Sequence, residues 1–307
     1  MNRGVILVTD SLFIFEEHIK KLNDAGYEVE RLDKPNATSE ELINSLKGKV
    51  GYILGGMERI TDDILENTEG LRVISFTGTD YKAIIPGTNT AKKKGIAITN
   101  SPGANADAVS EFAIAVALLM QRNLLELGRT GSEVFKTTNS IIGAKVGVIG
   151  AGNIGTRIIK QISVFGPEKV VYFNRSKKEC GAECVELDEL VSTCDIIFIT
   201  VSGGAGTILG HLEVSKLKKS TLVVSISPNN VMDLESLYPR LKSGDVRAAI
   251  DWPAPGQKFL DLPLSVWFNT NDHTAYNTYH ATKLASDMAV ESIINVLKTG
   301  DDQFRVV

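Results

Sequence analysis

The sequence is poor in cysteine, histidine and tryptophan. Its 307 residues include three cysteines, four histidines and two tryptophans. The cysteines are odd in number, and the close pair Cys180 and Cys184 has no matching cluster elsewhere in the chain. Neither a disulfide framework nor a zinc site is therefore indicated. We expect free thiols, no bound metal and a cytoplasmic location.

Long apolar runs and a strong excess of one charge are also missing. No apolar run reaches the roughly 18 residues of a membrane-spanning helix, and the run after Gly4 is too short for the core of a signal peptide. The chain has 33 basic and 37 acidic residues and a net charge of −4. These values predict a globular protein whose partners are neither nucleic acids nor membranes.

Strand-like and helix-like segments alternate along the chain. In the first third, strands are expected at residues 5–9, 27–32, 50–54, 71–76 and 96–99. The helix after the second strand is opened by a capping box formed by Thr38 and Glu41. Further strands are expected near residues 145–150, 169–174, 195–201, 221–226, 246–251 and 265–269. This order predicts an α/β protein with two doubly wound domains, each built on a parallel sheet.

Two longer helices stand outside this alternation. Residues 104–126 are apolar around most of the circumference, which predicts a buried helix. Residues 281–299 have an amphipathic pattern, and this terminal helix could pack back on the first domain. His18 and His211 lie in or beside helical segments and are expected at the surface, and no metal pair of His280 with His273 is expected.

The most informative segment is the glycine motif Gly150-x-Gly152-x-x-Gly155. An apolar strand pattern precedes it, and a helical pattern follows it. In such a turn the first glycine permits the bend, the second lets a pyrophosphate approach the backbone, and the third lets helix and strand pack closely. The helix begins near Asn153 and Ile154, where free N–H groups face the phosphates. The motif predicts that the chain binds a dinucleotide.

The residues after the next strand indicate which dinucleotide is bound. Sites for NAD have Asp or Glu about 20 residues past the motif, where it accepts hydrogen bonds from the ribose. Here the segment reads Asn174-Arg175-Ser176-Lys177-Lys178, with no carboxylate. Arg175 can stack on adenine or bind a 2′-phosphate, and Ser176 can donate to that phosphate. We predict NADPH/NADP+ as the cofactor; the alternative is an ordinary solvated Lys/Arg turn.

Several stretches resemble the D-isomer-specific 2-hydroxyacid dehydrogenase family. Besides the glycine motif, they are residues 95–111, 232–237, 241–244, 248–251 and 272–275. The resemblance implies a flavodoxin-like substrate domain, residues 1–100 plus 277–307, and an inserted Rossmann dinucleotide-binding domain, residues 101–276. It also implies a homodimer built on the helix that starts near Ala104. We include Val201 and Asp251 among the cofactor-binding residues, with Asp251 orienting the nicotinamide carboxamide or the catalytic histidine.

The resemblance extends to only one of three catalytic positions. Family members use a histidine for proton transfer, a glutamate paired with it, and an arginine that binds the substrate carboxylate and carbonyl. The histidine matches His273. The arginine position, five residues before Asp233, holds Pro228, and the glutamate position, five residues after Asp251, holds Gly256. Both charged groups are therefore gone.

The missing charges change the expected chemistry. Losing one electrostatic group at a developing oxyanion typically slows a reaction by about 10²–10³-fold. Without the glutamate the imidazolium is less favoured, so the pKa of His273 is expected to lie nearer its ordinary value of about 6.5. Reduction of a classical 2-oxo acid is therefore not expected. Asn229 is a candidate substitute for the arginine in substrate binding, although Pro-Asn-Asn is also an ordinary turn.

Two loops of the first domain match the substrate loops of the family. One is Gly55-Gly56-Met57, which follows the third strand, and its glycines could equally form a simple turn. The other contains Gly78 and Thr79, and is followed by Asp80 where the family usually has glycine. An inward-facing carboxylate there would disfavour an anionic substrate.

Two functions are consistent with the sequence. The first is an NADP(H)-dependent oxidoreductase that transfers hydride to a small carbonyl or imine substrate, with His273 as the proton donor. The second is a sensor or partner-binding protein that binds NADP(H) and has little catalytic activity. The loss of two catalytic residues favours the second function, and the retained histidine favours the first.

Overall fold

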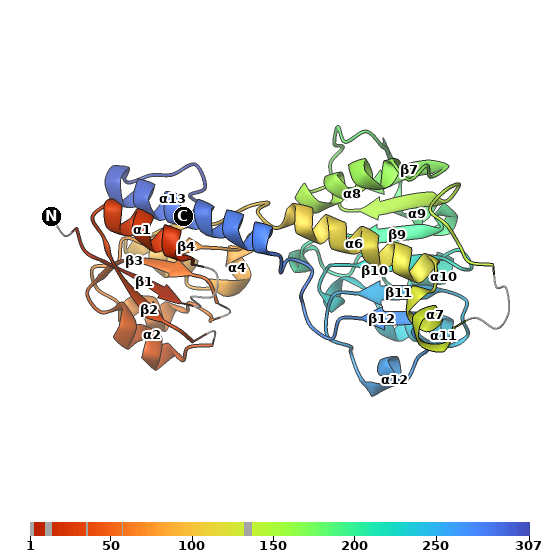
Figure 1. Cartoon of the computed structure of the whole chain (residues 1–307), viewed down its shortest axis with the longest axis horizontal. Coiled ribbons are helices and arrows are strands. Elements are labelled where there is room, and N and C mark those ends of the chain that lie inside the picture. The colour runs from red at the N-terminus through yellow and green to blue at the C-terminus, as the bar shows by residue number, and fades with distance from the viewer. Residues whose placement is uncertain (1–2, 10–13, 35, 57, 132–136) are drawn as a thin grey trace. The chain divides into compact units, whose positions relative to one another are not determined.

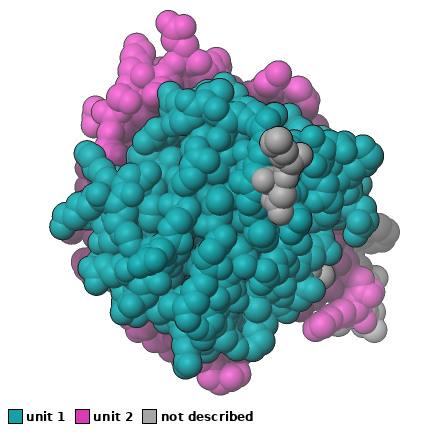
Figure 2. All heavy atoms as spheres, turned by 90° about the vertical axis from the view of Figure 1, so that its left-hand side faces the viewer, with its two compact units in different colours: residues 1–105, 278–307 teal, residues 106–277 magenta. Residues whose placement is uncertain are grey.

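The computed structural model describes residues 3–9, 14–34, 36–56, 58–131 and 137–307. The chain forms two compact units, each described here by itself (Figure 1). Unit 1 comprises Met1–Asn105 and Thr278–Val307, and unit 2 comprises Ala106–Asn277. In the space-filling view of Figure 2, the two segments of unit 1 fill one continuous body.

Unit 1 is built on a parallel sheet with the strand order β2-β1-β3-β4-β5. Its strands are β1 (Val5–Thr9), β2 (Glu28–Leu32), β3 (Lys49–Leu54), β4 (Val73–Phe76) and β5 (Ala97–Thr99). Its helices are α1 (Glu16–Asp24), α2 (Ser39–Leu46), α3 (Asp62–Glu66), α4 (Tyr81–Ile84), α5 (Thr88–Lys93) and α13 (Tyr279–Thr299). This order is flavodoxin-like, which confirms the predicted fold of this part of the chain.

Helix α2 begins where the sequence places it. The Thr38 side chain accepts a hydrogen bond from the Glu41 backbone N–H at 3.3 Å, and the Glu41 carboxylate accepts one from the Thr38 N–H at 3.0 Å. The two bonds satisfy donors that a helix start otherwise leaves free. The capping box is confirmed.

The terminal helix α13 packs on the sheet of unit 1. Gly51 of β3 makes room for it, because a Cβ there would lie 2.8 Å from the Ile293 Cδ1. Helix α13 also contacts α1, and the two ribbons run side by side in Figure 1. His18 of α1 is only 1% exposed, and its Nε2 lies 3.0 Å from the Asp287 Oδ1. The expectation of a surface position for His18 was wrong, because the polar side of α1 faces α13.

Unit 2 is built on a second parallel sheet, with the order β12-β11-β10-β9-β6-β7-β8. Its strands are β6 (Lys145–Ile149), β7 (Lys169–Phe173), β8 (Glu183–Cys184), β9 (Ile196–Ile199), β10 (Leu222–Ser225), β11 (Arg247–Ile250) and β12 (Trp267–Asn269). Numbered from β6, this is the Rossmann order with one further strand. The predicted Rossmann fold is confirmed.

The helices of unit 2 begin with a long apolar one. They are α6 (Ala106–Gln121), α7 (Leu124–Thr130), α8 (Asn153–Ser163), α9 (Leu187–Thr193), α10 (His211–Lys216), α11 (Leu234–Lys242) and α12 (Gln257–Leu260). The single helix expected over residues 104–126 is divided at Asn123, whose φ is +51°, a conformation that asparagine tolerates better than most residues. Most of α6 is buried, as expected. No helix that the structure describes is long and apolar enough to cross a membrane.

Candidate active site

The glycine motif forms a tight turn between β6 and α8. Gly150 has a φ of +98°, which favours glycine. A Cβ on Gly155 would lie 1.9 Å from the Gly150 carbonyl oxygen, so only glycine lets α8 approach the turn so closely. A Cβ on Gly152 would meet no atom within 4 Å. The first and third glycines therefore serve the fold, and the second leaves open space.

The start of α8 is free to bind an anion. The backbone N–H groups of Gly152, Asn153, Ile154 and Gly155 have no acceptor among the described residues. Beside them lies a hollow of about 190 Å³. It is lined by Ile149, Gly150, Gly152, Phe173, Asn174, Arg175, Thr200, Val201, Ser202, Ala205 and Ile208. Open space at Gly152, free N–H groups and this hollow fit the phosphates and adenosine of a dinucleotide.

The turn after β7 is attached to the glycine motif by one side chain. The Asn174 Oδ1 accepts a hydrogen bond from the Ala151 N–H at 3.2 Å, and its Nδ2 donates to the Ser176 carbonyl at 2.8 Å. Arg175 and Ser176 are exposed. The Arg175 guanidinium has no partner within the described part of the chain. It is therefore available to a ligand.

Six residues that were not predicted from the sequence also line this hollow, and two of them, Ile149 and Phe173, end the strands β6 and β7. The other four, Thr200, Ser202, Ala205 and Ile208, follow β9, the neighbour of β6 on the side away from β7. Ligands of doubly wound sheets bind where the strand order reverses, at the carboxyl ends of the strands. The predicted strand near residues 195–201 was thus the signal that could have identified those four.

His273 is held at the carboxyl end of the same sheet by Asp251. Its Nδ1 lies 3.1 Å from the Asp251 Oδ2 and 3.3 Å from the Asp251 carbonyl oxygen. The Asp251 carboxylate is fully buried and also accepts hydrogen bonds from the Thr270 hydroxyl and from two backbone N–H groups, those of Thr274 and Ala275. These donors occupy both carboxylate oxygens. The contacts favour the histidine-orienting role of Asp251 over a contact with a nicotinamide carboxamide.

The pairing with Asp251 changes the acidity of the histidine. Burial disfavours the charged imidazolium, but the hydrogen bonds and the negative charge of Asp251 outweigh it and raise the pKa of His273 above 6.5. Burial opposes the charged carboxylate as well, yet its donors hold the pKa of Asp251 below 3.8. Asp251 thus supplies a negative charge to the imidazole, whereas Gly256 supplies none.

An aromatic side chain that sequence analysis did not name covers one face of His273. The Trp252 ring stacks on the imidazole with the ring centres 4.7 Å apart and the planes 19° apart. Tyr276 contacts the imidazole at a tilt, with ring centres 5.3 Å apart. The His273 side chain remains 39% exposed, and its Nε2 has no hydrogen-bond partner among the described residues. That nitrogen is free to exchange a proton with a ligand.

The structure offers no guanidinium at the position of the missing arginine. Arg240, which follows Pro228 in sequence, donates to the Val214 and Leu217 carbonyl groups and pairs with Asp245. It is thus committed to the fold. Asn229 is half-buried, and its Nδ2 donates to the Pro253 carbonyl at 2.9 Å, whereas its buried Oδ1 has no partner among the described residues.

The two candidate substrate loops of unit 1 lie at the carboxyl ends of neighbouring strands. Gly55 and Gly56 follow β3, and Gly78 and Thr79 follow β4. A Cβ on Gly78 would lie 2.4 Å from the Phe76 ring, so close packing demands this glycine. Asp80 is exposed. Met57, the remaining predicted residue, lies outside the described residues.

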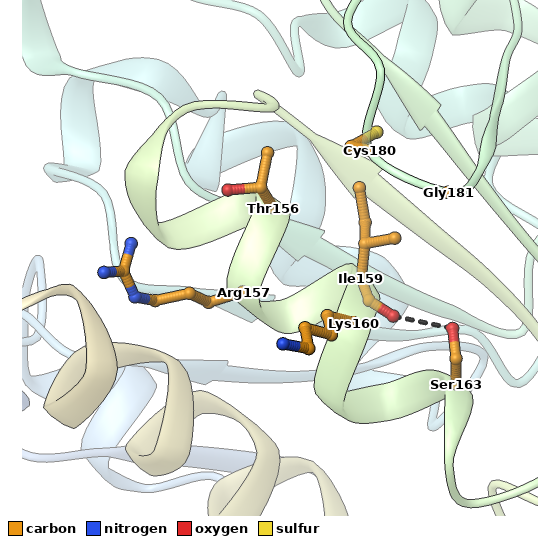
Figure 3. Close-up of a pocket in the computed structure, with 7 residues that line it drawn as sticks. All are labelled: Thr156, Arg157, Ile159, Lys160, Ser163, Cys180 and Gly181. Atoms are coloured by element: carbon orange, nitrogen blue, oxygen red, sulfur yellow. Dashed lines mark hydrogen bonds between the residues drawn. The ribbon is translucent and has the colours of Figure 1, made fainter.

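A larger hollow on α8 lies apart from these groups. It measures about 470 Å³ and is lined by Thr156, Arg157, Ile159, Lys160, Ser163, Cys180 and Gly181 (Figure 3). Arg157 pairs with Asp107 of α6 at 2.5 Å, and the Ser163 hydroxyl donates to the Ile159 carbonyl at 2.6 Å. None of the predicted site residues lines it. Five of the predicted cofactor-binding residues, Gly150, Gly152, Asn174, Arg175 and Val201, line the smaller hollow instead.

Proteins of known function are similar to this chain. Residues 115–266 match the model of a family described as D-isomer specific 2-hydroxyacid dehydrogenase, NAD binding domain. Hydroxypyruvate reductase of Thermotoga maritima is 31% identical over 220 residues, which cover 68% of this chain and 71% of that protein. D-3-phosphoglycerate dehydrogenase of Methanocaldococcus jannaschii is 30% identical over 308 residues, which cover 95% of this chain and 57% of that protein. The chain thus spans little more than half the length of this relative.

A solved structure has the same fold. The acyclic imino acid reductase in complex with NADPH and D-Arg has a TM-score of 0.85 at 23% identity, and the match covers 99% of this chain and 100% of that one. The flavodoxin-like and Rossmann strand orders, the glycine turn and these matches lead to one assignment. The chain belongs to the D-isomer-specific 2-hydroxyacid dehydrogenase family.

Proposed function

We propose that this protein is an NADP(H)-dependent oxidoreductase that reduces a small carbonyl or imine substrate other than a classical 2-oxo acid. One observation carries the proposal. His273, held by Asp251, stands at the same edge of one parallel sheet as the glycine turn and the open start of α8. A proton donor and a dinucleotide site at one sheet edge are the two parts that such a reduction needs.

The residues of the glycine turn and of the next turn would hold the cofactor. The free N–H groups at the start of α8 would bind the pyrophosphate, which approaches the backbone at Gly152. Arg175 and Ser176 would bind the 2′-phosphate, since no carboxylate of the turn repels it. Val201 lines the same hollow. A bound nicotinamide supplies the hydride.

His273 would supply the proton. Because Asp251 engages Nδ1, the imidazolium keeps its second proton on Nε2, which has no partner among the described residues. Nε2 would give this proton to the oxygen or nitrogen atom that becomes negative as hydride arrives. The raised pKa of His273 keeps more of the side chain protonated near neutral pH, which suits a proton donor.

The substrate would differ from that of most family members. Neither Pro228 nor Gly256 carries a charge, so a carboxylate beside the reacting carbon has no guanidinium partner. The unpaired Oδ1 of Asn229 is an acceptor, which suits the N–H of a protonated imine better than an oxyanion. Gly55, Gly56, Gly78 and Thr79 remain the proposed substrate-binding residues of unit 1, as the resemblance implies. The imino acid reductase of the same fold binds NADPH and D-Arg, so the fold accommodates this class of ligand.

A protein that senses NADP(H) is the second candidate. The same two missing charges favour it, because they remove groups that accelerate reduction in the family. In that case His273 would serve only to hold the ligand. The retained pairing of His273 with Asp251 would then have no effect on turnover.

A screen of NADPH oxidation separates the two candidates. The purified protein is tested with aldehydes, ketones, 2-oxo acids, and mixtures of aldehydes or ketones with amines, which form imines. We expect turnover with a ketone, an aldehyde or an imine, little with 2-oxo acids alone, and loss of turnover in H273A. Tight NADPH binding with no turnover in any mixture would contradict the oxidoreductase and support the NADP(H) sensor.

We also propose a homodimer formed through unit 2. Because α6 is mostly buried within the chain, the exposed apolar side chains now carry this proposal. They are Leu124, 52% exposed, Ile142, 74%, Val164, 82%, and Phe165, 38%. Gly143 donates a hydrogen bond to Gly166 and Asn139 donates one to Gln121, so the segments that carry these side chains are neighbours. An apolar patch of this kind marks an interface.

Light scattering tests the dimer. We expect a dimeric mass at micromolar concentration, and a monomer for Val164→Asp. Leu212→Asp is the control, because Leu212 is 64% exposed on α10 and outside the patch. A monomeric mass for the unchanged protein would contradict the proposal.

A further inference from the structure

His273 is fixed from three directions. Asp251 holds Nδ1 at 3.1 Å, Trp252 covers one ring face at a centre distance of 4.7 Å, and Tyr276 packs at 5.3 Å with a tilt of 50°. A hydrogen bond to one nitrogen leaves a ring free to turn about that bond. A second ring stacked parallel to the imidazole prevents this rotation. Of the two aromatic neighbours, only Trp252 lies nearly parallel, at 19°.

Trp252 packs against a buried apolar cluster of unit 2, which holds it in place independently of His273. Its indole Nε1 is buried and has no acceptor in the described part of the chain, although a buried indole N–H usually finds one. No hydrogen bond therefore aims the side chain. Its backbone segment is braced instead, since Asn269 donates to the Trp252 carbonyl at 3.4 Å and Asn229 donates to the Pro253 carbonyl at 2.9 Å. The braces hold the indole against the imidazole.

We propose that Trp252 is a positioning residue, whose ring fixes the plane of His273 so that Nε2 faces the reacting atoms. The inference rests on the proposed function, because it assigns Trp252 a part in the proton transfer by His273. Family members place a glutamate at the position of Gly256. Here Asp251 supplies the negative charge beside the imidazole, and Trp252, the next residue in the sequence, fixes the orientation of the imidazole plane.

The stack also acts on the charge state of the histidine. An indole face attracts a cation, so it stabilises the imidazolium over the neutral ring. The charged groups that act on His273 are acidic: Asp251 at Nδ1, and Asp272, whose carboxylate accepts the His273 backbone N–H at 2.7 Å. Burial opposes these groups. Trp252 would therefore add to the two carboxylates in keeping His273 protonated.

Three variants test the proposal. W252L removes the aromatic face, and W252F keeps an aromatic face but removes the N–H. W267F is the matched control: Trp267 lies in the core and its Nε1 donates to the Asn269 Oδ1 at 3.3 Å, but it does not stack on His273. The measurements are kcat/KM against pH, NADPH affinity, and the pKa of His273 from the NMR signals of its ring in the free protein.

We expect W252L to lose kcat/KM by roughly 3- to 30-fold, and its activity to fall at a pH lower by about 0.5 to 1 unit. The sign follows because the proton donor is the imidazolium, which is lost sooner as pH rises when the indole no longer stabilises it. NADPH affinity should not change. W252F should restore most of the loss, and W267F should leave the pH profile in place. If W252L does not fold, W252M takes its place.

Several results would overturn the proposal. They are an unchanged pH profile in W252L, an equal loss in W252F, or an equal shift in W267F. Failure of the proposed function is a separate result, namely no turnover in any substrate mixture. In that case the NMR titration still tests the role of Trp252, because the pKa of His273 must fall in W252L and remain unchanged in W252F. A pKa that does not move in W252L would sink the inference without reference to turnover.

Discussion

The glycine turn and His273 lie at the same edge of the sheet of unit 2, but they differ in how many of the family's functional residues they retain. At the glycine turn, three features typical of a dinucleotide site are present: the left-handed Gly150, the open space at Gly152 and the close approach at Gly155. At the histidine end, Pro228 and Gly256 stand at the two positions where the family has charged residues, and Asp251 pairs with His273. The residues proposed to bind the cofactor and those proposed to act on the substrate follow different strands. Either set can therefore change during evolution without the other.

The largest expected effect is a loss of turnover with no change in NADPH affinity. His273→Ala should lower kcat by about 10²–10⁴-fold, the usual contribution of a positioned proton donor. NADPH affinity should stay the same, because the hollow beside the glycine turn has no contribution from His273. Stopped-flow turnover and a fluorescence titration of NADPH check the two halves of the prediction. Equal losses in both would show that the ends are not independent.

The opposite experiment breaks the cofactor end in two different ways. Gly155→Ala places a Cβ 1.9 Å from a backbone oxygen, so we expect a lower melting temperature as well as loss of NADPH binding. Gly152→Ala meets no atom within 4 Å, so the free protein should keep its stability while NADPH affinity falls by about 100-fold. Calorimetry of the free and NADPH-bound protein distinguishes the two. A destabilised Gly152→Ala would show that this space is not reserved for the cofactor.

Asp251→Asn sharpens the comparison at the histidine end. The pKa of Asp251 is lowered below 3.8, so its contribution to stability is present above that pH and lost as pH falls through the lowered value. The pKa of His273 is raised above 6.5, so its contribution is present below that pH and lost as pH rises through the raised value.

The destabilisation by Asp251→Asn should therefore be largest between pH 3.8 and 6.5. We expect about 2–3 kcal/mol there, mostly from buried N–H groups that lose an acceptor. The ionic part is smaller, because the His273 side chain is 39% exposed and solvent screens it. Urea unfolding at several pH values measures the difference. A difference that does not change with pH would contradict the assigned pairing.

The smallest effect concerns the choice of cofactor. Arg175→Ala should weaken NADPH binding on the order of 10-fold, the lower end for a charge-assisted hydrogen bond, because Arg175 is exposed. NADH binding should not change. Titrations of both cofactors at moderate salt test this, with Lys160→Ala as the control for a lost surface charge. Equal affinities for NADPH and NADH in the unchanged protein would overturn the cofactor assignment.

Most of the fold could be predicted from the sequence, because buried strands of a parallel sheet are short, apolar and separated by helical patterns. The order of both sheets followed from that alternation and from the resemblance. Strand β8 was missed because it has only two residues, Glu183 and Cys184. The break between α6 and α7 was missed because nothing in the apolar pattern marks the left-handed Asn123.

The site was less accessible to sequence reasoning where it depends on contacts between distant segments. The surface assignment of His18 failed because its partner Asp287 is 269 positions away. Asp251 could be predicted only with two alternative roles, because the donors that fix its carboxylate, Thr270, Thr274 and Ala275, lie 19 to 24 positions away. Trp252 carried no signal of its own, since one aromatic residue in a proline-rich loop is compatible with many positions.

The amide of Asn174 has a thermodynamic consequence. It joins the Ala151 N–H of the glycine turn to the Ser176 carbonyl of the next turn, so the two phosphate-binding segments share one brace. A ligand fragment that orders one segment reduces the conformational entropy that the other segment still has to lose. The affinities of a 2′-phosphate fragment and a pyrophosphate fragment should therefore be cooperative, and the whole cofactor should bind more tightly than their independent free energies imply.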